Sequence, residues 1–151
     1  MSAERQKISF QRMTLIGRAN GICFKYGGKI GGTREAHRLI YLCQTRKSVE
    51  VRDKVVEKIF EAFHEREMDI SDKGVLRGIA IDAGVEEEEV NEWFEGDLGG
   101  SEVNDEAVRV REVFGSVGVP VFLIQGKHRV DGAQDPPEFM EIFEQVKNEG
   151  H

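Results

Sequence analysis

The sequence predicts an α/β protein in which a long helical part is followed by a β-hairpin and a terminal helix. Apolar residues recur every three to four positions through most of the chain up to the strands, which is the spacing of amphipathic helices. The run Val121–Ile124 is instead continuously apolar and partly β-branched, which is typical of a strand. Because this run is apolar on both faces, we expect an interior strand with helices on each side. No other segment offers a good partner strand, so the sequence describes part of a sheet.

The first two predicted helices flank a connector that is rich in glycine. The first helix is predicted over residues 8–20, with Gly21 at its end. The four glycines within residues 27–32 make the connector too flexible for a regular element. Thr33 is the expected N-cap of a helix over residues 33–44, whose apolar positions keep helical spacing.

Serines are expected to begin the next two helices. Ser48 is the predicted N-cap of an amphipathic helix that ends near Glu65. Ser71 is the predicted N-cap of the helix that follows. Gly84 should terminate that helix, because glycine readily adopts the left-handed conformation found just past helix C-termini.

A short acidic helix is predicted over residues 86–94. Its glutamates cluster at the start, where the helix dipole stabilises negative charge. Four consecutive side chains cannot converge on one ion, so this run is interpreted as a solvated helix start and not as a metal site. Gly99 and Gly100 should then interrupt the chain before a helix that is marked by apolar residues from Val103 to Phe114 and runs into the strand at Gly118.

Pro120 opens the first strand of the predicted hairpin. Proline cannot donate to a sheet ladder, so it is confined to strand starts, edges and bulges. From the residues alone, a trans proline that merely begins the strand, a cis peptide bond, and backbone left free for a ligand all stay open. A turn at Gly126 and Lys127, a second strand over residues 128–130 and a terminal helix over residues 137–146 complete the chain.

Composition excludes several classes of protein. The length of 151 residues fits one domain, or one domain with an insertion. The net charge of −7 argues against a nucleic-acid surface, which needs a basic stripe. No apolar run approaches the roughly 20 residues of a membrane span. The polar N-terminus has no apolar signal-peptide core, so a cytoplasmic or otherwise reducing location is expected.

The cysteines and histidines point to packing and not to chemistry. Cys23 and Cys43 are expected to be free thiols in a reducing location. Both are interpreted as buried, Cys43 on the apolar face of its helix and Cys23 between Ile22 and Phe24. Cys43 lies near a helix C-terminus, which gives a thiol none of the activation that a helix N-terminus would give. The histidines are scattered and no Cys-x-x-Cys occurs, so no metal site is expected.

Six segments carry a resemblance to a known family. They are Gly21-Ile22-Cys23-Phe24, Thr33-Arg34-Glu35-Ala36-His37-Arg38-Leu39-Ile40, Phe60-Glu61-Ala62-Phe63, Asp69-Ile70-Ser71-Asp72, Val117-Gly118-Val119-Pro120-Val121-Phe122 and Gly132-Ala133-Gln134. In this order they resemble the C-terminal two thirds of DsbA-like thioredoxin-fold proteins, most closely the FrnE-like branch of thiol–disulfide oxidoreductases. The stretch from Ala36 to Leu39, taken with Gly132-Ala133-Gln134, is the more specific part of the resemblance.

The resemblance implies a partial thioredoxin-like fold of the DsbA type. Residues 1–110 would form a large, mainly helical insertion, and residues 111–151 would supply a helix, the β-hairpin and the terminal helix of the thioredoxin-like domain. In the family, a reactive Cys-x-x-Cys lies on an N-terminal strand–helix–strand segment that this chain lacks. We therefore expect a member that is truncated and redox-inactive as given, with no catalytic residue of its own.

The resemblance also implies where a substrate would bind. In the family the corresponding proline is cis, so the resemblance implies that Val119 and Pro120 would present their backbone to an extended peptide or to glutathione. In related kappa transferases and chromene-carboxylate isomerases, the loop equivalent to Ala133 and Gln134 contacts the glutamyl end of glutathione. The residues themselves favour a simpler helix-entry turn at this loop. His37 would either face the active site or pack as a hydrogen-bonded partner of the connector.

Three functions stay open at this point. The first is a DsbA-like thiol–disulfide oxidoreductase, with an extended peptide or thiol substrate at the Val119-Pro120 strand. The second is a non-catalytic module that binds a peptide, glutathione or another copy of itself through an exposed hairpin edge. The third is a relative of the glutathione-dependent isomerases and transferases. No cofactor is expected other than glutathione, and neither nucleic acid nor membrane is expected as a partner.

Overall fold

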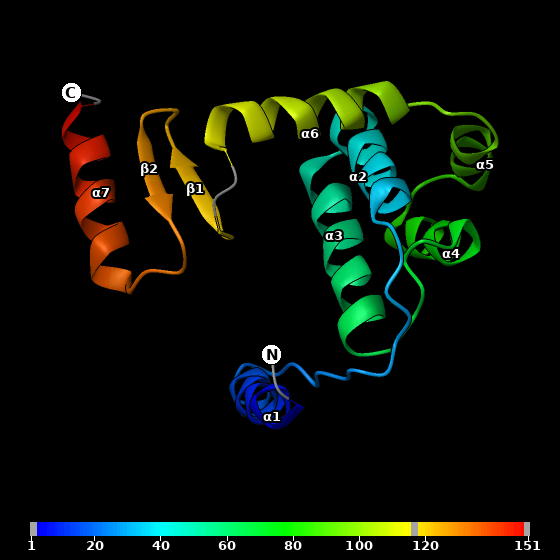
Figure 1. Ribbon diagram of the computed structural model, residues 1–151. Coiled ribbons are helices and arrows are strands. Elements are labelled where there is room, and N and C mark those ends of the chain that lie inside the picture. The colour runs from blue at the N-terminus through cyan, green and yellow to red at the C-terminus, as the bar shows by residue number, and fades with distance from the viewer. Residues whose placement is uncertain (1–2, 116–117, 150–151) are drawn as a thin grey trace. The chain divides into compact units, whose positions relative to one another are not determined.

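The computed structural model describes residues 3–115 and 118–149 (Figure 1). Within these residues the elements are α1 (Ala3–Ala19), α2 (Arg34–Arg46), α3 (Val49–His64), α4 (Lys73–Ala83), α5 (Glu87–Glu95), α6 (Gly100–Phe114), β1 (Val121–Ile124), β2 (His128–Asp131) and α7 (Pro136–Glu149). The chain divides into a helical unit, Met1–Asp105, and a C-terminal unit, Glu106–His151. None of the described helices is long and apolar enough to cross a membrane.

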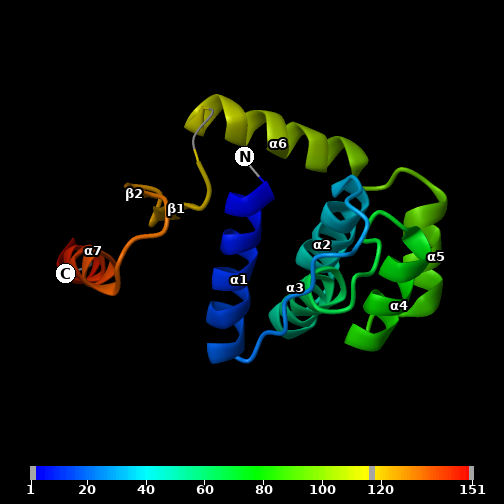
Figure 2. The ribbon, with the colours of Figure 1, turned by 60° about the horizontal axis from the view of Figure 1, so that its bottom comes forward.

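The core of the helical unit lies among α2, α3, α4 and α5, which pack on one another in both ribbon views (Figures 1 and 2). Most of the apolar positions that predicted these helices are buried or partly buried in the structure, and Phe60 of α3 is an exposed exception. Fully buried members include Leu39, Cys43, Val55, Leu76 and Val90. The predicted helices are therefore confirmed, since burial of an apolar stripe is what stabilises helices of this length.

The helix starts differ in part from the sequence prediction. The side chain of Ser48 caps α3 by accepting the Val51 amide, as expected. Ser71 does not cap α4: the N-cap is Asp72, whose carboxylate accepts the amides of Gly74 and Val75. The hydroxyl of Ser71 instead donates to Asp69, which removes it from the helix end. Thr33 stands at the N-cap of α2 but makes no side-chain cap bond.

The glycine-rich connector is irregular, as predicted, yet it is held along its length by the segment after α3. Alternate residues make the contacts: the amides of Cys23, Lys25 and Gly27 donate to the Glu65 carboxylate, the His64 carbonyl and the Glu67 carboxylate. Further along, the ammonium of Lys29 donates to Asp69 at 2.6 Å. A period of two in these contacts is that of a locally extended chain.

Helix α1 begins earlier than residue 8, at Ala3. It meets the rest of the unit through its inner side, where the Phe10 and Tyr26 rings stack with centroids 4.2 Å apart. The Phe24 ring lies so close to Gly17 that a Cβ at this position would come within 2.5 Å of the ring. Much of the apolar surface of α1 stays exposed, including Ile8 and Leu15.

The expected break at Gly99 and Gly100 is present between α5 and α6, but only Gly99 belongs to it. Gly99 makes the turn, with a φ of 74°, and Gly100 is the first residue of the helix. The Val103 amide already donates to the Gly99 carbonyl at 3.1 Å. The helix starts here because the glycine turn directly precedes it and Gly100 fits beside the side chains of Arg34 and Asp97.

In the C-terminal unit, β1 and β2 form an antiparallel hairpin beside α7 (Figures 1 and 2). The turn centres on Gln125 and Gly126, with φ of 53° and 68°, one residue earlier than predicted. The Lys127 amide closes this turn by donating to the Ile124 carbonyl. Positive φ at both central residues is typical of the mirror-image turns that suit the twist of a hairpin.

The strand β1 is not covered on both faces in this structure, contrary to the expectation of an interior strand. Phe122 is 39% exposed and Leu123 is 49% exposed. On one face the Phe122 ring meets the Phe139 ring of α7 edge-on, with centroids 5.0 Å apart. The apolar character of β1 therefore exceeds what the described part of this unit buries.

Candidate functional site

The candidate site begins at the residues that lead into β1. The Val119–Pro120 peptide bond is cis. The Val119 side chain is 90% exposed, and its backbone amide and carbonyl make no hydrogen bond to another described residue. The Pro120 carbonyl accepts the Gly132 amide at 2.8 Å. Val117, at the edge of the segment that carries the resemblance, lies outside the described residues.

The hairpin leaves one edge of β1 open among the described residues. Val121 is paired with Asp131 and Phe122 with Val130. In an antiparallel pair, hydrogen-bonded and non-hydrogen-bonded positions alternate. Because the Pro120 carbonyl bonds to Gly132, the backbone groups of Val119, Val121 and Leu123 point away from β2. These groups form a row that another strand could pair with.

The loop after β2 lies next to Pro120, so the structure brings the two predicted substrate-binding segments together. Ala133 and Gln134 are both exposed. The side-chain nitrogen of Gln134 donates to the Asp131 carbonyl at 2.9 Å, which leaves its amide oxygen without a partner among the described residues. The loop also enters α7, where the Glu138 amide donates to the Asp135 carbonyl. The geometry is therefore that of a helix-entry turn with unpaired polar atoms at its surface.

The ends of the hairpin are fixed by charged side chains. Arg129 of β2 donates to Asp131 at 2.9 Å and lies over the Phe114 ring at the end of α6, 5.4 Å from its centroid. At the turn, the Lys127 ammonium bonds to Glu149 of α7 at 3.2 Å and lowers the pKa of that carboxyl group. These contacts join β2 to the end of α6 and the hairpin turn to the end of α7 within the C-terminal unit.

His37 belongs to the helical unit, whereas the hairpin residues belong to the C-terminal unit. Its Nδ1 donates to the Thr33 carbonyl at 2.8 Å, and its backbone amide donates to the same carbonyl at 3.0 Å. The ring is otherwise exposed. The contacts of His37 are thus those of a hydrogen-bonded residue in the first turn of α2.

Arg38 of α2 is a buried charged residue that was not predicted as part of a site. Its side chain is 1% exposed and donates to the carbonyls of Trp93, Gly96 and Leu98 at 2.8–2.9 Å. A fourth bond goes to the Glu35 carboxylate at 2.6 Å. The signal was available, since Arg38 lies four residues before the buried Leu42 and so falls on the apolar stripe of α2.

The two cysteines differ in their exposure. Cys43 is buried as predicted, and burial raises the pKa of its thiol to about 11. Cys23 is exposed, so the expectation that it is buried was wrong. Its neighbours Ile22 and Phe24 point to the opposite side of a locally extended segment, which explains the error. Across the described residues, no group of three or more His, Cys, Asp or Glu side chains is placed to hold a metal.

Comparison with known proteins decides the family. Residues 1–144 match the sequence model of the family described as DSBA-like thioredoxin domain. The chain belongs to the DSBA-like thioredoxin domain family. This match confirms the family expected from the six sequence segments, and it covers both units of the chain.

A solved structure shows the same fold. The crystal structure of a probable DsbA oxidoreductase from Streptomyces coelicolor matches with a TM-score of 0.85 at 24% sequence identity. The match covers 99% of this DSBA-like chain and 63% of that protein. This chain thus spans less than two thirds of the length of that DsbA oxidoreductase. A search of curated proteins finds no match.

Proposed function

We propose that this chain is the substrate-docking part of a DsbA-like thiol–disulfide oxidoreductase. The observation that carries the proposal is the row of unpaired backbone groups at Val119, Val121 and Leu123. Such a row binds an extended peptide by strand addition, with main-chain hydrogen bonds for affinity and side-chain contacts for selectivity. The strongly exposed Val119 would meet the substrate first, and the substrate would be an extended segment next to a cysteine.

The proposal assigns no thiol chemistry to the two cysteines of this chain. Thiol–disulfide exchange needs a thiolate with access to the substrate. Cys43 is buried and its pKa is raised to about 11, so it stays protonated near neutral pH. Cys23 is exposed but has no cysteine beside it, since both cysteines are free. We therefore propose that the 151-residue chain binds substrate without catalysing exchange, and that it works in a reducing, cytoplasmic setting.

Docking is tested with short apolar peptides and amide chemical shifts. The peptide should perturb the amides of Val119, Val121 and Leu123 and leave those of α2 unchanged. Two control peptides carry N-methyl groups, one at the odd-numbered and one at the even-numbered residues. In strand addition only one of these sets of amides donates to β1, so one methylated peptide should bind much more weakly than the other. Equal binding by the two methylated peptides would exclude strand addition.

Exchange is tested separately by insulin reduction with dithiothreitol. The chain should not increase the rate above that of dithiothreitol alone, and Cys23→Ser should give the same result. A rate increase that disappears in Cys23→Ser would show that the chain is an active oxidoreductase and that the binding-only proposal is wrong.

A second candidate function, a non-catalytic glutathione-binding module, is supported by the loop after β2. Ala133 and the free amide oxygen of Gln134 are exposed beside Pro120. An isomerase or transferase of the glutathione-dependent type would use this same loop, together with a catalytic serine or cysteine. Calorimetric titration with glutathione tests this candidate. Binding that Gln134→Leu weakens would favour it over a peptide-docking role, and an absence of heat would reject it.

A further inference from the structure

A hollow with an aromatic floor opens on the helical unit, between α1, the connector and α3. We call it the aromatic hollow, and its volume is about 630 Å³. Its apolar wall is formed by Met13 of α1, by Ile22, Phe24 and Tyr26 of the connector, and by Phe60 of α3. This size is within the range of roughly 300–1,000 Å³ that is usual for binding sites.

The pairing of the connector explains why these side chains face the hollow. The odd-numbered residues Cys23, Lys25 and Gly27 give their amides to the segment after α3. The even-numbered residues therefore point to the other side and form the floor. Phe60 is 59% exposed and Met13 is 42% exposed, so large apolar side chains meet solvent here. A contiguous apolar surface of this kind marks a binding surface more often than a packing defect.

Carboxylates also line the aromatic hollow. Glu57 and Glu61 of α3 and Glu65, its C-cap, are spaced four residues apart and so lie on one side of the helix end. Glu61 is paired with Arg66 at 2.6 Å, and Glu65 accepts the Cys23 amide at 2.9 Å. Glu57 has no partner among the described residues. Aromatic faces beside carboxylates attract a cation with an apolar stem.

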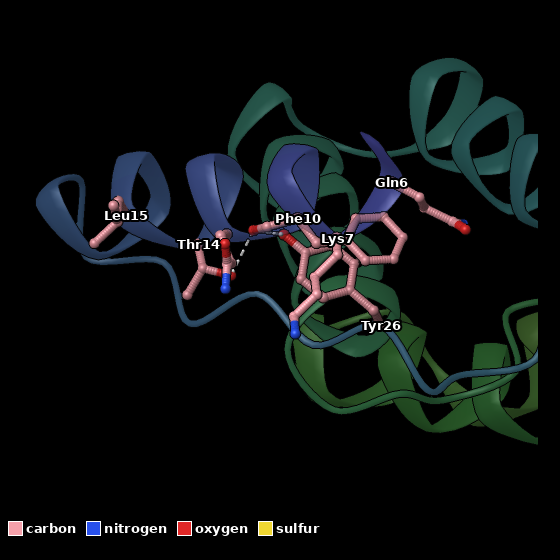
Figure 3. Close-up of a pocket in the computed structure, with 7 residues that line it drawn as sticks. Gln6, Lys7, Phe10, Thr14, Leu15 and Tyr26 are labelled. Carbon is pink, nitrogen blue, oxygen red and sulfur yellow. Dashed lines mark hydrogen bonds between the residues drawn. The ribbon is translucent and has the colours of Figure 1, made fainter. Parts of the chain in front are cut away.

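A second hollow of about 670 Å³ adjoins the first and shares Tyr26 with it. Figure 3 shows its wall, where Phe10 and Tyr26 lie ring to ring and the hydroxyls of Thr14 and Tyr26 donate to the Phe10 carbonyl. Lys7 is the charged residue of this wall. Two adjoining hollows fit a peptide segment better than a single small amine, and their opposite charges favour one direction of that segment.

We propose that the aromatic hollow docks a peptide segment of a partner protein in which a Lys or Arg stands next to a large apolar residue. The cationic head faces Glu57 and its neighbours, its alkyl stem lies on Phe60 and Tyr26, and the apolar neighbour enters the second hollow. This surface lies wholly within the helical unit, and the proposal does not depend on the thiol chemistry or on the hairpin.

The test uses fluorescein-labelled peptides and anisotropy titration of the whole chain. The first probe is a short peptide that combines Phe and Leu with Lys. Its matched partners replace each Lys by Glu, or each apolar residue by Ser. The basic apolar peptide should bind most tightly, and its affinity should fall as salt rises because the carboxylate contacts are screened. Equal affinity for the basic and acidic peptides would overturn the proposal.

Two surface variants locate the site. Glu57→Gln should weaken binding about threefold, the scale of one exposed charge pair. Phe60→Ala should weaken it about tenfold or more, as expected for a central aromatic contact. Their controls are Glu92→Gln on α5 and Ile81→Ala on α4, both exposed and outside the hollow, and both should bind like the parent chain.

The remaining outcomes also decide the question. Retained affinity in Glu57→Gln and Phe60→Ala, with circular dichroism showing a folded chain, would place the peptide elsewhere and overturn the proposal. Light scattering after size exclusion gives the oligomeric state of the same samples. A dimer that Phe60→Ala dissociates would show that a second copy of the chain fills the hollow. A folded monomer that binds none of the peptides would overturn the proposal that a basic apolar peptide docks there.

Discussion

The replacement of Arg38 by methionine gives the sharpest test of how the helical unit is held together. The guanidinium donates to the Trp93 carbonyl of α5, to two carbonyls between α5 and α6, and to the Glu35 carboxylate. Methionine keeps most of the side-chain volume and removes every donor. The bond to the Trp93 carbonyl is fully buried, and those to the Gly96 and Leu98 carbonyls are partly buried.

The expected loss of stability follows from these partners. A buried acceptor left without a donor costs about 1–3 kcal/mol. Removing one partner of a buried ionic contact costs about 3–5 kcal/mol. Two of the three carbonyls are only partly buried, so water can replace the lost donors there. We therefore expect Arg38→Met to lower the free energy of unfolding by about 3 kcal/mol, the lower end of the range for a buried ionic contact. Arg38→Lys keeps the charge but loses the planar set of guanidinium donors, so its free energy of unfolding should lie between those of Arg38→Met and the parent chain.

Urea unfolding followed by tryptophan fluorescence measures this loss. Trp93 is the single tryptophan of the chain, and its indole donates to the Arg38 carbonyl, so the signal reports the unit in question. Arg52→Ala is the control, because the Arg52 side chain bonds only its neighbour Asp53 among the described residues. A loss for Arg38→Met no greater than that for Arg52→Ala, at equal denaturant slope, would refute this view of the buried guanidinium.

Three further predictions concern the connector and the thiols. Gly28→Ala should destabilise the helical unit by about 1–3 kcal/mol, because the added Cβ would lie 3.1 Å from the Glu67 Cα. Gly32→Ala, where a Cβ meets nothing within 4 Å, is its control in the same urea assay. The Lys29 and Ser71 hydrogen bonds lower the pKa of Asp69 to about 2, so this carboxylate stabilises the fold above the ordinary Asp pKa near 3.8. The difference in urea midpoint between the parent and Asp69→Asn should therefore be full above pH 4 and shrink as the pH falls toward 2; a difference independent of pH would contradict the assignment. Ellman's reagent should label the exposed Cys23 in the native chain and reach Cys43 only after unfolding, and Cys23→Ser should show no rapid labelling.

Helices could be predicted from the sequence because their cores follow directly from apolar spacing. Leu39, Cys43, Val55 and Leu76 all lie where the spacing placed them. The choice between Ser71 and Asp72 as a cap could not be made in this way. Both residue types are good caps, and the Ser71 hydroxyl is engaged by Asp69 through a contact that spacing does not reveal.

The candidate site depended more on resemblance than on pattern. A proline before an apolar strand has several explanations, and nothing local joins it to a loop more than ten residues away. The hairpin register supplies that link through the bond from Gly132 to Pro120. For Arg38, the position on the apolar stripe of α2 indicates burial, but the carbonyls that its guanidinium meets lie about 60 residues away and follow only from the structure. The binding roles of Val119, Pro120, Ala133 and Gln134 stay predictions.

The alternating contacts of the connector make its length, counted in odd and even steps, a property of the fold. Amides at residues 23, 25 and 27 secure the chain, and side chains at residues 22, 24 and 26 line the aromatic hollow. Deleting one residue before Ile22 would leave this alternation intact. Deleting one between Cys23 and Gly27 would exchange the two sides, so that residues whose amides are now bonded would face the hollow and residues that line it would face away. Insertions or deletions of two residues preserve the parity. Loop engineering in this region should therefore proceed in pairs.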